Sequence, residues 1–333
     1  MDSVKVAVIG VGAMGRNHAR VYAELPEAQL VAVADADEQL AAAVAGKFGV
    51  TPYSNYKDLL EKEKPDAVSV AVPTAMHHAV ASTCMRAGAD VLIEKPIAST
   101  VVEGQQLIAM AAELGRKLMV GHIVRFNPAM RALKEKLDAG EVGRIFQIVC
   151  RRVGPFPARI RDVGVVVDLA PHDIDVMRYL TGESPERVYA ETEQRVHTEH
   201  EDLVFGLLHF PGGVTGALEI NWLTPTKVRE TLVLGERGMF RVDDLTQDLY
   251  FFENAELDGE MWPALGTIKG VSEGRMVRYP LSRYEPLRAE LQAFIGVLGN
   301  NDPMPVSGED GLEALRLAQA LIESGKTNQV VKV

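Results

Sequence analysis

A glycine motif near the start of the chain constrains its fold more than any other feature. An apolar run ends in Gly-x-Gly-x-x-Gly, a helix-like segment follows, and a second apolar run closes on an aspartate. The first glycine allows a tight turn, the second lets the backbone approach a pyrophosphate, and the third lets the helix pack on the strand. The pyrophosphate then lies at the positive end of the helix. The predicted cofactor-binding residues of this turn are Gly10, Gly12, Ala13, Met14 and Gly15.

The acid that closes the second apolar run is Asp35. It lies about twenty residues after the last glycine, where a carboxylate accepts hydrogen bonds from an adenosine ribose. A carboxylate at this position repels a 2′-phosphate, and neither Ala36 nor Asp37 supplies an arginine that would accommodate one. The motif therefore predicts NAD rather than NADP as the cofactor. A tight strand-to-helix turn that binds no ligand is the alternative.

Composition limits the class of protein. A length of 333 residues suggests two domains, and 47% hydrophobic with 24% charged residues is ordinary for a globular protein. No apolar run reaches the roughly 18 residues of a membrane span, and the chain enters its first strand without room for a signal peptide, so we expect a cytoplasmic protein. The net charge of −11 argues against nucleic acid or an anionic membrane as partner. The two cysteines, Cys84 and Cys150, are expected to be buried apolar residues.

Strands and helices alternate up to residue 121, which predicts a doubly wound parallel sheet, a Rossmann domain. In such sheets ligands bind beyond the carboxyl ends of the strands. We therefore expect the loops at Gly10, Asp35, Pro73 and Lys95 to face one crevice. Strands are expected at 4–9, 30–34, 67–72, 91–93 and 118–121, with helices at 14–25, 38–48, 56–62, 76–87 and 101–114.

The pattern changes after residue 121. Strand-like runs joined by short turns predict an α+β domain with a large, mostly antiparallel sheet. We place the NAD-binding domain at residues 1–123 and the substrate-binding and oligomerisation domain at 124–333. The segment 253–279 has weak periodicity and is expected to be rich in loops. Strands are expected at 145–153, 187–194, 204–210, 214–222, 230–234 and 239–242, with helices at 128–137, 166–180, 284–298 and 308–324.

Lys95 is the first candidate for catalysis. It lies at the carboxyl end of a strand, between Glu94 and Pro96. A lysine there can be desolvated, which lowers its pKa, or can serve as a fixed cation beside an alkoxide or carbonyl oxygen. Glu94 and Lys95 are both predicted to contact the cofactor, and the Glu94 side chain is expected to point away or to fix the loop. An exposed lysine at a loop tip is the alternative.

A second candidate group lies on the predicted helix 166–180. Asp168 and His172 are four residues apart and Asp175 follows three later, so all three share one helical face. A histidine between carboxylates suits a general base tuned near neutral pH. A zinc site is the rival interpretation, but it lacks a clear third ligand, and we predict no metal.

The loop after the strand at 67–72 carries further candidates for cofactor contact. Pro73 and Thr74 close that strand, and His77 and His78 follow. One of the two histidines could touch the nicotinamide ribose, and capping of the helix start is the alternative.

Four arginines, Arg151, Arg152, Arg159 and Arg161, precede the helix that carries Asp168. Guanidinium groups suit phosphate or carboxylate, so the cluster suggests an anion site. Arg151 and Arg152 must face opposite sides of a strand, so at most one of them points into such a site. A charged surface loop is the alternative.

Taken together, these motifs resemble the glucose-fructose oxidoreductase / inositol dehydrogenase / MocA-like family over essentially the whole chain. The resemblance is carried by the glycine motif, Glu94-Lys95-Pro96, Arg125-Phe126-Asn127-Pro128 and Asp168-x-x-x-His172. It implies hydride transfer between NAD(P) and a sugar or cyclitol carbon, with Lys95 and His172 as the catalytic pair and Asp168 supporting them. It also implies subunit contacts through the C-terminal sheet, in a homodimer or homotetramer. Family members often have two glycines before the aspartate, whereas here Val165-Val166-Val167 follows Gly164.

Within the family, residues 121–128 and 151–168 look most like sugar-nucleotide dehydrogenases that oxidise the 3-hydroxyl of UDP-N-acetylglucosamine. We therefore expect an NAD-dependent dehydrogenase of a nucleotide-activated hexose. An inositol or free-aldose dehydrogenase of the same family is one alternative, and a dinucleotide-sensing protein without catalysis is another. The predicted substrate-binding residues are Arg125, Asn127, Arg152, Arg159, Arg161, Asp168 and His172.

Overall fold

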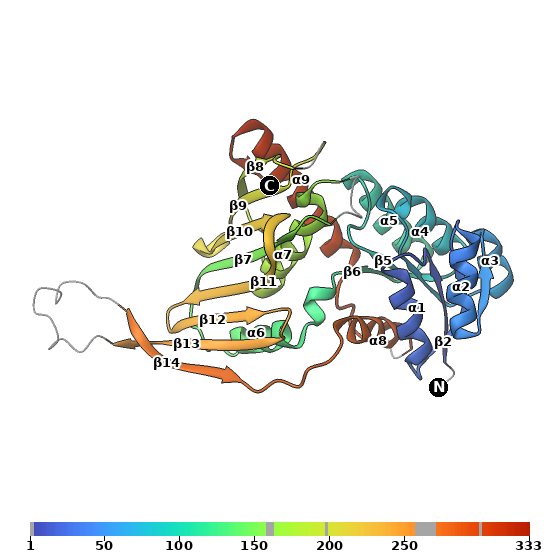
Figure 1. Cartoon of the computed structure of the whole chain (residues 1–333), viewed down its shortest axis with the longest axis horizontal. Coiled ribbons are helices and arrows are strands. Elements are labelled where there is room, and N and C mark those ends of the chain that lie inside the picture. Colours follow the sequence, from blue (N-terminus) through green and yellow to red (C-terminus); the bar gives the residue numbers. More distant parts are fainter. Residues whose placement is uncertain (1–2, 158–162, 197–198, 257–270, 300–301) are drawn as a thin grey trace, which may run out of the picture. The chain divides into compact units, whose positions relative to one another are not determined.

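The glycine motif joins the first strand and first helix of a six-stranded parallel sheet. The structure, a computed structural model, describes residues 3–157, 163–196, 199–256, 271–299 and 302–333. The chain divides into two compact units, the first made of Met1–Phe126 and Tyr284–Arg316, the second of Asn127–Arg283 and Leu317–Val333. Each unit has its own sheet (Figure 1).

The sheet of the first unit has the order β3-β2-β1-β4-β5-β6, drawn in blue and teal in Figure 1. Its direction of growth reverses between β1 and β4, so the crevice beyond their carboxyl ends is the expected ligand site. The fold predicted for this part of the chain is confirmed, with element ends within a few residues of the prediction, but the edge strand at Thr51–Tyr53 was not predicted. The strands are β1 (Val4–Ile9), β2 (Ala28–Ala34), β3 (Thr51–Tyr53), β4 (Ala67–Val70), β5 (Asp90–Glu94) and β6 (Leu118–Gly121).

Local signals set the ends of the helices in this unit. Asp37 caps α2 by accepting from two backbone N–H groups, and Thr100 with Glu103 forms a capping box on α5. Glycines in the left-handed conformation, Gly49 and Gly115, end the same two helices. The helices are α1 (Gly15–Glu24), α2 (Glu38–Phe48), α3 (Tyr56–Glu63), α4 (His77–Arg86), α5 (Val101–Leu114) and α8 (Pro286–Gly299), with 3₁₀ turns η1 (Thr74–Met76) and η2 (Ile123–Phe126).

Helix α8 comes late in the chain but belongs to the first unit. Leu287, Leu291 and Phe294 are buried in the same hydrophobic core as the parallel sheet. The sequence predicts one second domain at residues 124–333, but in the structure residues 284–316 pack with the first unit. Order along the chain could not reveal this return, since the apolar face of α8 fits either domain by pattern.

The second unit is built on a nine-stranded sheet of order β14-β13-β12-β11-β7-β10-β9-β8-β15, drawn in green to orange in Figure 1 apart from β15. All strand pairs are antiparallel except β7 with β10, which confirms the predicted mostly antiparallel sheet. Helix α7 packs against β7, β9 and β10 and so covers one face. The strands are β7 (Ile145–Pro155), β8 (Arg187–Glu193), β9 (Leu203–His209), β10 (Thr215–Asn221), β11 (Leu223–Gly235), β12 (Gly238–Asp243), β13 (Asp248–Glu256), β14 (Val271–Tyr279) and β15 (Val331–Lys332).

The remaining helices are α6 (Pro128–Asp138), α7 (Val165–Thr181) and α9 (Gly308–Thr327), with a 3₁₀ turn η3 (Pro211–Gly213). The predicted loop-rich character of 253–279 is wrong for its described parts, because β13 continues to Glu256 and Val271–Tyr279 forms β14. These strands pair with each other, and that tertiary pairing compensates for weak alternation in the sequence.

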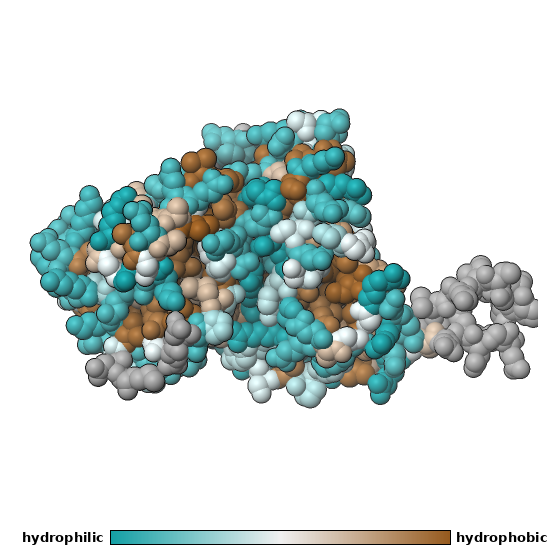
Figure 2. Space-filling view, turned by 180° about the vertical axis from the view of Figure 1, so that it is seen from behind, coloured by the Kyte–Doolittle hydropathy of each residue, from teal (hydrophilic) through white to brown (hydrophobic). Residues whose placement is uncertain are grey.

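The surface and the cysteines agree with the composition. Figure 2 shows one face of the molecule, on which hydrophobic atoms form separate patches among hydrophilic ones. Among the described residues no helix is long and apolar enough to cross a membrane. Cys84 and Cys150 are both free and buried, as predicted, and burial raises the pKa of each thiol.

Candidate active site

The three motif glycines differ in the space around them. Gly10 has a φ of +84°, and a Cβ there would lie 2.7 Å from the carbonyl carbon of Ala71. A Cβ on Gly15 would lie 1.7 Å from the carbonyl oxygen of Gly10, so the helix start cannot pack on the strand with any other residue. No described atom lies within 4 Å of a Cβ built on Gly12. The turn is therefore closed at its outer glycines and open at the middle one, as a pyrophosphate cradle requires.

The N-terminus of α1 is left uncapped on the side of this opening. Met14 is the N-cap, and it makes no side-chain cap hydrogen bond within the described part of the chain. The first turn of the helix also contains no acidic residue. Unsatisfied N–H groups and the helix dipole favour an anion at such an end. The residues from Gly10 to Gly15 thus fit the diphosphate of a dinucleotide.

Asp35 follows β2 and points at the glycine turn. Its Oδ2 accepts from the N–H of Val11 at 2.8 Å, and its Oδ1 accepts from the N–H of Asp37 at 3.0 Å. Each carboxylate oxygen can accept a second hydrogen bond. The same side chain can therefore hold the turn in shape and accept from a ribose hydroxyl.

The loop after β4 departs from the prediction at His77. The ring is 1% exposed; its Nδ1 lies 2.8 Å from the carbonyl oxygen of Pro96 and its Nε2 lies 2.9 Å from that of Val72. Burial lowers the pKa of this imidazole. Both ring nitrogens thus face carbonyl oxygens inside the unit, and a neutral ring donates to one of them at a time, instead of contacting a ribose or capping α4. Pro73 and Thr74 precede it at the start of η1, at the carboxyl edge of the sheet.

Glu94 and Lys95 lie at the end of β5, both half-buried. The Glu94 carboxylate accepts from Nε2 of His18 at 2.9 Å and from the N–H of Lys95 at 3.3 Å. Burial alone would raise its pKa, but the hydrogen bond and charge of His18 and the charge of Lys95 hold the pKa of Glu94 below its usual range. Glu94 was predicted either to point away or to fix its loop, and these contacts support the second role.

Asp168 and His172 lie on α7 in the second unit, both half-buried and one helical turn apart. Asp175, the third residue of the predicted face, is completely buried. Asp168 and His172 therefore form the part of that face accessible to a ligand, and Lys95 belongs to the other unit.

Glu201 lies against the N-terminus of α7, where the second glycine of the family pattern is missing. A Cβ on Gly164 would lie 2.0 Å from Oε1 of Glu201, so this carboxylate would have to move to admit a larger residue. The carbonyl and carboxylate of Glu201 accept from the N–H groups of Val165 and Val166 at 2.9 and 3.2 Å. Glu201 thus caps the N-terminus of α7, and the helix begins at the valines that follow Gly164.

The paired arginines on β7 face opposite sides, as predicted. Arg151 is exposed and pairs with Glu219 at 3.0 Å. Arg152 is buried, and its Nε donates to both oxygens of Asp173 at 2.8 and 2.9 Å while its Nη2 lies 3.5 Å from Asp244. Arg152 was predicted to contact the substrate, but its guanidinium already binds two carboxylates of the protein. Arg159 and Arg161 lie outside the described residues.

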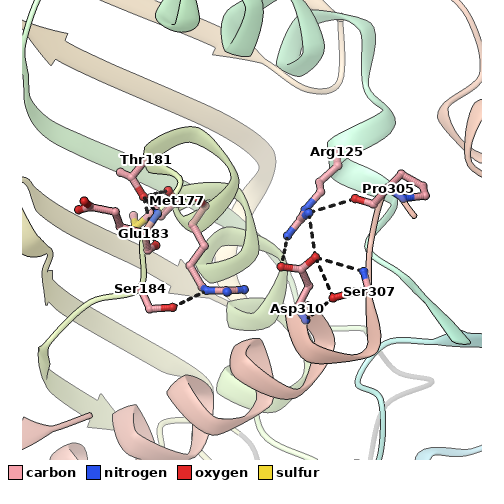
Figure 3. A network of polar contacts seen from close by, with 9 residues as sticks. Arg125, Met177, Thr181, Glu183, Ser184, Pro305, Ser307 and Asp310 are labelled. Atoms are coloured by element: carbon pink, nitrogen blue, oxygen red, sulfur yellow. Dashed lines mark hydrogen bonds and ion pairs between the residues drawn. The ribbon is translucent and has the colours of Figure 1, made fainter. Parts of the chain in front are cut away.

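Arg125 and Asn127 also have internal partners. The guanidinium of Arg125 donates to the carbonyl of Pro305 at 3.2 Å and pairs with Asp310, whose carboxylate also accepts from Ser307 (Figure 3). Asn127 caps α6 and donates to the carbonyl of Asp244 at 2.9 Å. Their substrate contacts remain predictions.

Two cations that the sequence analysis missed lie on β11 near Arg152. Residues 224–227 lie opposite the single residue Gly154 of β7, so β11 bulges there, and Lys227 packs against Gly154. Arg229 pairs in register with Arg152, and its Nη1 donates to the carbonyl of Val153 at 2.7 Å. Burial and neighbouring cations lower the pKa of Lys227, and burial and Arg152 lower that of Arg229 to about 10. Pro225, a few residues before the predicted strand 230–234, is the sequence signal for such an irregularity.

Metal ligands are not gathered in the described residues, where no group of three or more His, Cys, Asp or Glu side chains could hold an ion. The arrangement instead offers a dinucleotide cradle with a lysine in the first unit, and a histidine–aspartate pair with nearby cations in the second. This inventory suits hydride transfer supported by proton transfer.

Comparison with known proteins agrees with this chemistry. Residues 4–122 match the oxidoreductase family with an NAD-binding Rossmann fold, and residues 130–241 match the GFO/IDH/MocA C-terminal domain. The chain is 31% identical to UDP-N-acetylglucosamine 3-dehydrogenase of Acidithiobacillus ferrooxidans, over 96% of either protein. A solved structure of that dehydrogenase has a TM-score of 0.85 at 29% identity, covering 98% of this chain and 99% of the other. Inositol 2-dehydrogenase of Rubrobacter xylanophilus is 28% identical, covering 100% of this chain and 94% of that protein.

Proposed function

Because the chain belongs to the GFO/IDH/MocA family of NAD-binding oxidoreductases, we propose that it oxidises a secondary hydroxyl of a sugar nucleotide. The substrate that fits best is UDP-N-acetylglucosamine, converted at its 3-hydroxyl to the 3-keto sugar. The main support is the similarity along 96% of the chain to a dehydrogenase of that sugar nucleotide. Inositol dehydrogenases of similar identity make a free cyclitol the second candidate.

In this proposal the reaction divides between the units. The turn from Gly10 to Gly15 and Asp35 would hold NAD, which would supply the acceptor for the hydride of the carbon that carries the hydroxyl. His172, supported by Asp168, removes the hydroxyl proton, and the ammonium of Lys95 stabilises the charge that develops on the same oxygen. The proton roles of Lys95 and His172 can be exchanged without changing the products.

A phosphate-bearing substrate is favoured by the cations of the β11 bulge. Lys227 and Arg229 lie on the strand beside Arg152, and their lowered pKa values mean that their charged forms lack full compensation. An anion bound beside them would supply that compensation. A free cyclitol carries no anionic group and would not compensate the charges of Lys227 and Arg229.

Turnover assays test the proposal and separate its alternatives. NADH absorbance is followed with UDP-N-acetylglucosamine, myo-inositol and glucose as substrates. Lys95→Met should lower kcat by at least about 100-fold, whereas Lys57→Met, at an exposed position of α3, should leave it unchanged. Lys227→Gln should raise KM for the sugar nucleotide only. Equal turnover of wild type and Lys95→Met would overturn the catalytic assignment, and turnover of myo-inositol alone would overturn the substrate.

We further propose that the open face of the nine-stranded sheet binds a second copy of the chain. Cross-strand neighbours Leu207, Ala217, Val149 and Leu232 form an apolar row on β9, β10, β7 and β11. Leu207 and Phe205 are each 51% exposed, and paired faces of this kind are self-complementary about a two-fold axis.

Light scattering coupled to size exclusion tests this assembly. The wild type should be a dimer or larger, and Phe205→Glu with Leu207→Glu should yield monomers, while Val102→Glu on the 60% exposed position of α5 should change nothing. A monomeric wild type, or a double variant that keeps its size, would contradict the proposal.

A further inference from the structure

Two buried histidines lie behind the loop that carries Lys95. His18 on α1 is 0% exposed and His77 at the start of α4 is 1% exposed. Neither is on the surface that a ligand could reach, yet both nitrogens of each ring lie within hydrogen-bonding distance of another polar atom. Because buried polar groups persist only when they are paired, the partners of these rings indicate what they do.

His18 connects the first helix to Glu94 through a chain of hydrogen bonds. Its Nε2 lies 2.9 Å from Oε1 of Glu94, its Nδ1 lies 3.2 Å from Oγ of Ser69, and Oγ of Ser69 lies 2.8 Å from the hydroxyl of Tyr22. A carboxylate only accepts, so Nε2 of His18 donates to Glu94. In the contact between Ser69 and Tyr22 either hydroxyl can be the donor. Every member therefore has a partner, and the hydrogen bonds connect Tyr22 through Ser69 and His18 to Glu94.

Glu94 passes this constraint to the next residue. Its other oxygen accepts from the backbone N–H of Lys95 at 3.3 Å. A carboxylate held by a buried imidazole on one side thus fixes the direction in which the backbone leaves β5. The position of the Lys95 ammonium depends on that direction, because the side chain begins at the residue being held.

His77 holds the same loop one residue later. Its Nδ1 lies 2.8 Å from the carbonyl oxygen of Pro96, and its Nε2 lies 2.9 Å from that of Val72 at the end of β4. Both partners are carbonyl oxygens, so a neutral ring donates to one of them at a time and packs between the loop after β4 and the loop after β5. Pro96 is itself buried, so both ends of the Lys95 segment are anchored inside the unit.

We propose that His18 and His77 are positioning residues that hold Lys95 in place and couple it to the loops that bind the cofactor. His18 ties it to the helix that follows the glycine turn, and His77 ties it to the loop at Pro73. This inference rests on the proposed catalytic role of Lys95. A shift of about 1 Å in a catalytic group can cost on the order of 100-fold in rate, so loss of either brace should lower kcat more than it changes substrate or cofactor affinity.

Substitutions of graded severity test the role of His18. His18→Met removes both hydrogen bonds at similar volume, and kcat should fall about 100-fold while KM and the Kd for NADH stay within about 3-fold. His18→Gln retains an amide donor that can reach Glu94, so at least about a tenth of the lost rate should return. Tyr22→Phe removes only the first hydroxyl and should have the smallest effect.

The role of His77 is tested in the same way. His77→Leu should lower kcat with little change in KM, and His77→Asn, whose amide can still donate to Pro96, should recover part of it. His209→Met, at a half-buried position of β9, is the matched control and should behave as wild type. Far-ultraviolet circular dichroism identifies variants that do not fold, and in that case Tyr22→Phe and His18→Gln carry the test.

A readout independent of turnover separates this inference from the proposed function. The rate at which a lysine-selective acylating reagent modifies Lys95, followed by peptide mass spectrometry, should change at least about 3-fold in His18→Met and His77→Leu. Lys57 serves as the internal reference. Wild-type enzyme that does not oxidise a sugar nucleotide would refute the proposed function, while the labelling still tests the braces. Unchanged Lys95 labelling, or a lost rate that appears in KM instead of kcat, would overturn the inference.

Discussion

The buried ion pair of Arg152 and Asp173 distinguishes a structural arginine from a substrate-binding one. Their side chains are 9% and 3% exposed, and the Nη2 and Nε nitrogens lie 2.7 to 2.9 Å from the carboxylate oxygens. Removing one partner of such a pair costs about 3–5 kcal/mol, because the other charge stays buried. We therefore expect Asp173→Asn to lower the free energy of unfolding substantially.

Asp244 sets where in that range each variant falls. In Asp173→Asn, Arg152 still has Asp244 at 3.5 Å, so the loss should be near 3 kcal/mol. In Arg152→Met both carboxylates lose their cation, and the loss should be near 5 kcal/mol. The double variant Arg152→Met with Asp173→Leu should be more stable than Arg152→Met alone, since it leaves only one carboxylate without a cation.

Urea unfolding, followed by fluorescence and circular dichroism, measures these differences. A loss of 3 kcal/mol corresponds to a midpoint shift of about 1–3 M. Arg151→Met, which breaks the exposed pair with Glu219, is the control and should cost less than about 1 kcal/mol. If Asp173→Asn and Arg152→Met change stability by less than about 1 kcal/mol but raise KM for the sugar nucleotide, our reasoning is refuted and Arg152 is a substrate contact.

Three further predictions concern the glycine turn, the cofactor and pH. Gly15→Ala should destabilise the first unit because its Cβ would lie 1.7 Å from Gly10, whereas Gly12→Ala should unfold like wild type and only weaken NADH binding, measured by fluorescence titration. Asp35→Ser should raise the affinity for NADP relative to NAD by at least about 10-fold, since it removes a carboxylate that repels the 2′-phosphate; an unchanged ratio would contradict the selectivity argument. Burial raises the pKa of Asp244 from 3.8 to about 6, so the native state binds this proton more tightly than the unfolded state. Stability should therefore fall by about 3 kcal/mol as pH rises from about 4 to above 6, and Asp244→Asn should abolish that part of the pH dependence in urea titrations.

Much of the first unit could be predicted because its signals are local. The glycine turn, the caps and the apolar runs each act within a few residues, so the order of strands and helices follows from the sequence. The same holds for Asp168 and His172, whose spacing places them on one face of α7 in any helix. The opposite orientation of Arg151 and Arg152 follows from the alternation of a strand.

The remaining features depend on partners distant in sequence. Arg152 reads as an anion-binding residue until Asp173 and Asp244 are brought against it. The bulge that presents Lys227 exists only because β11 pairs with β7 across Gly154.

By itself the sequence determined the alternation of strands and helices, the dinucleotide turn and the candidates for catalysis, because covalent spacing carries that information. Tertiary structure decided which charged groups neutralise each other, that α8 returns to the first core, and that His18 and His77 lie behind Lys95. Hydrogen bonds and ion pairs between distant segments form only when the chain has folded, so no local pattern encodes them.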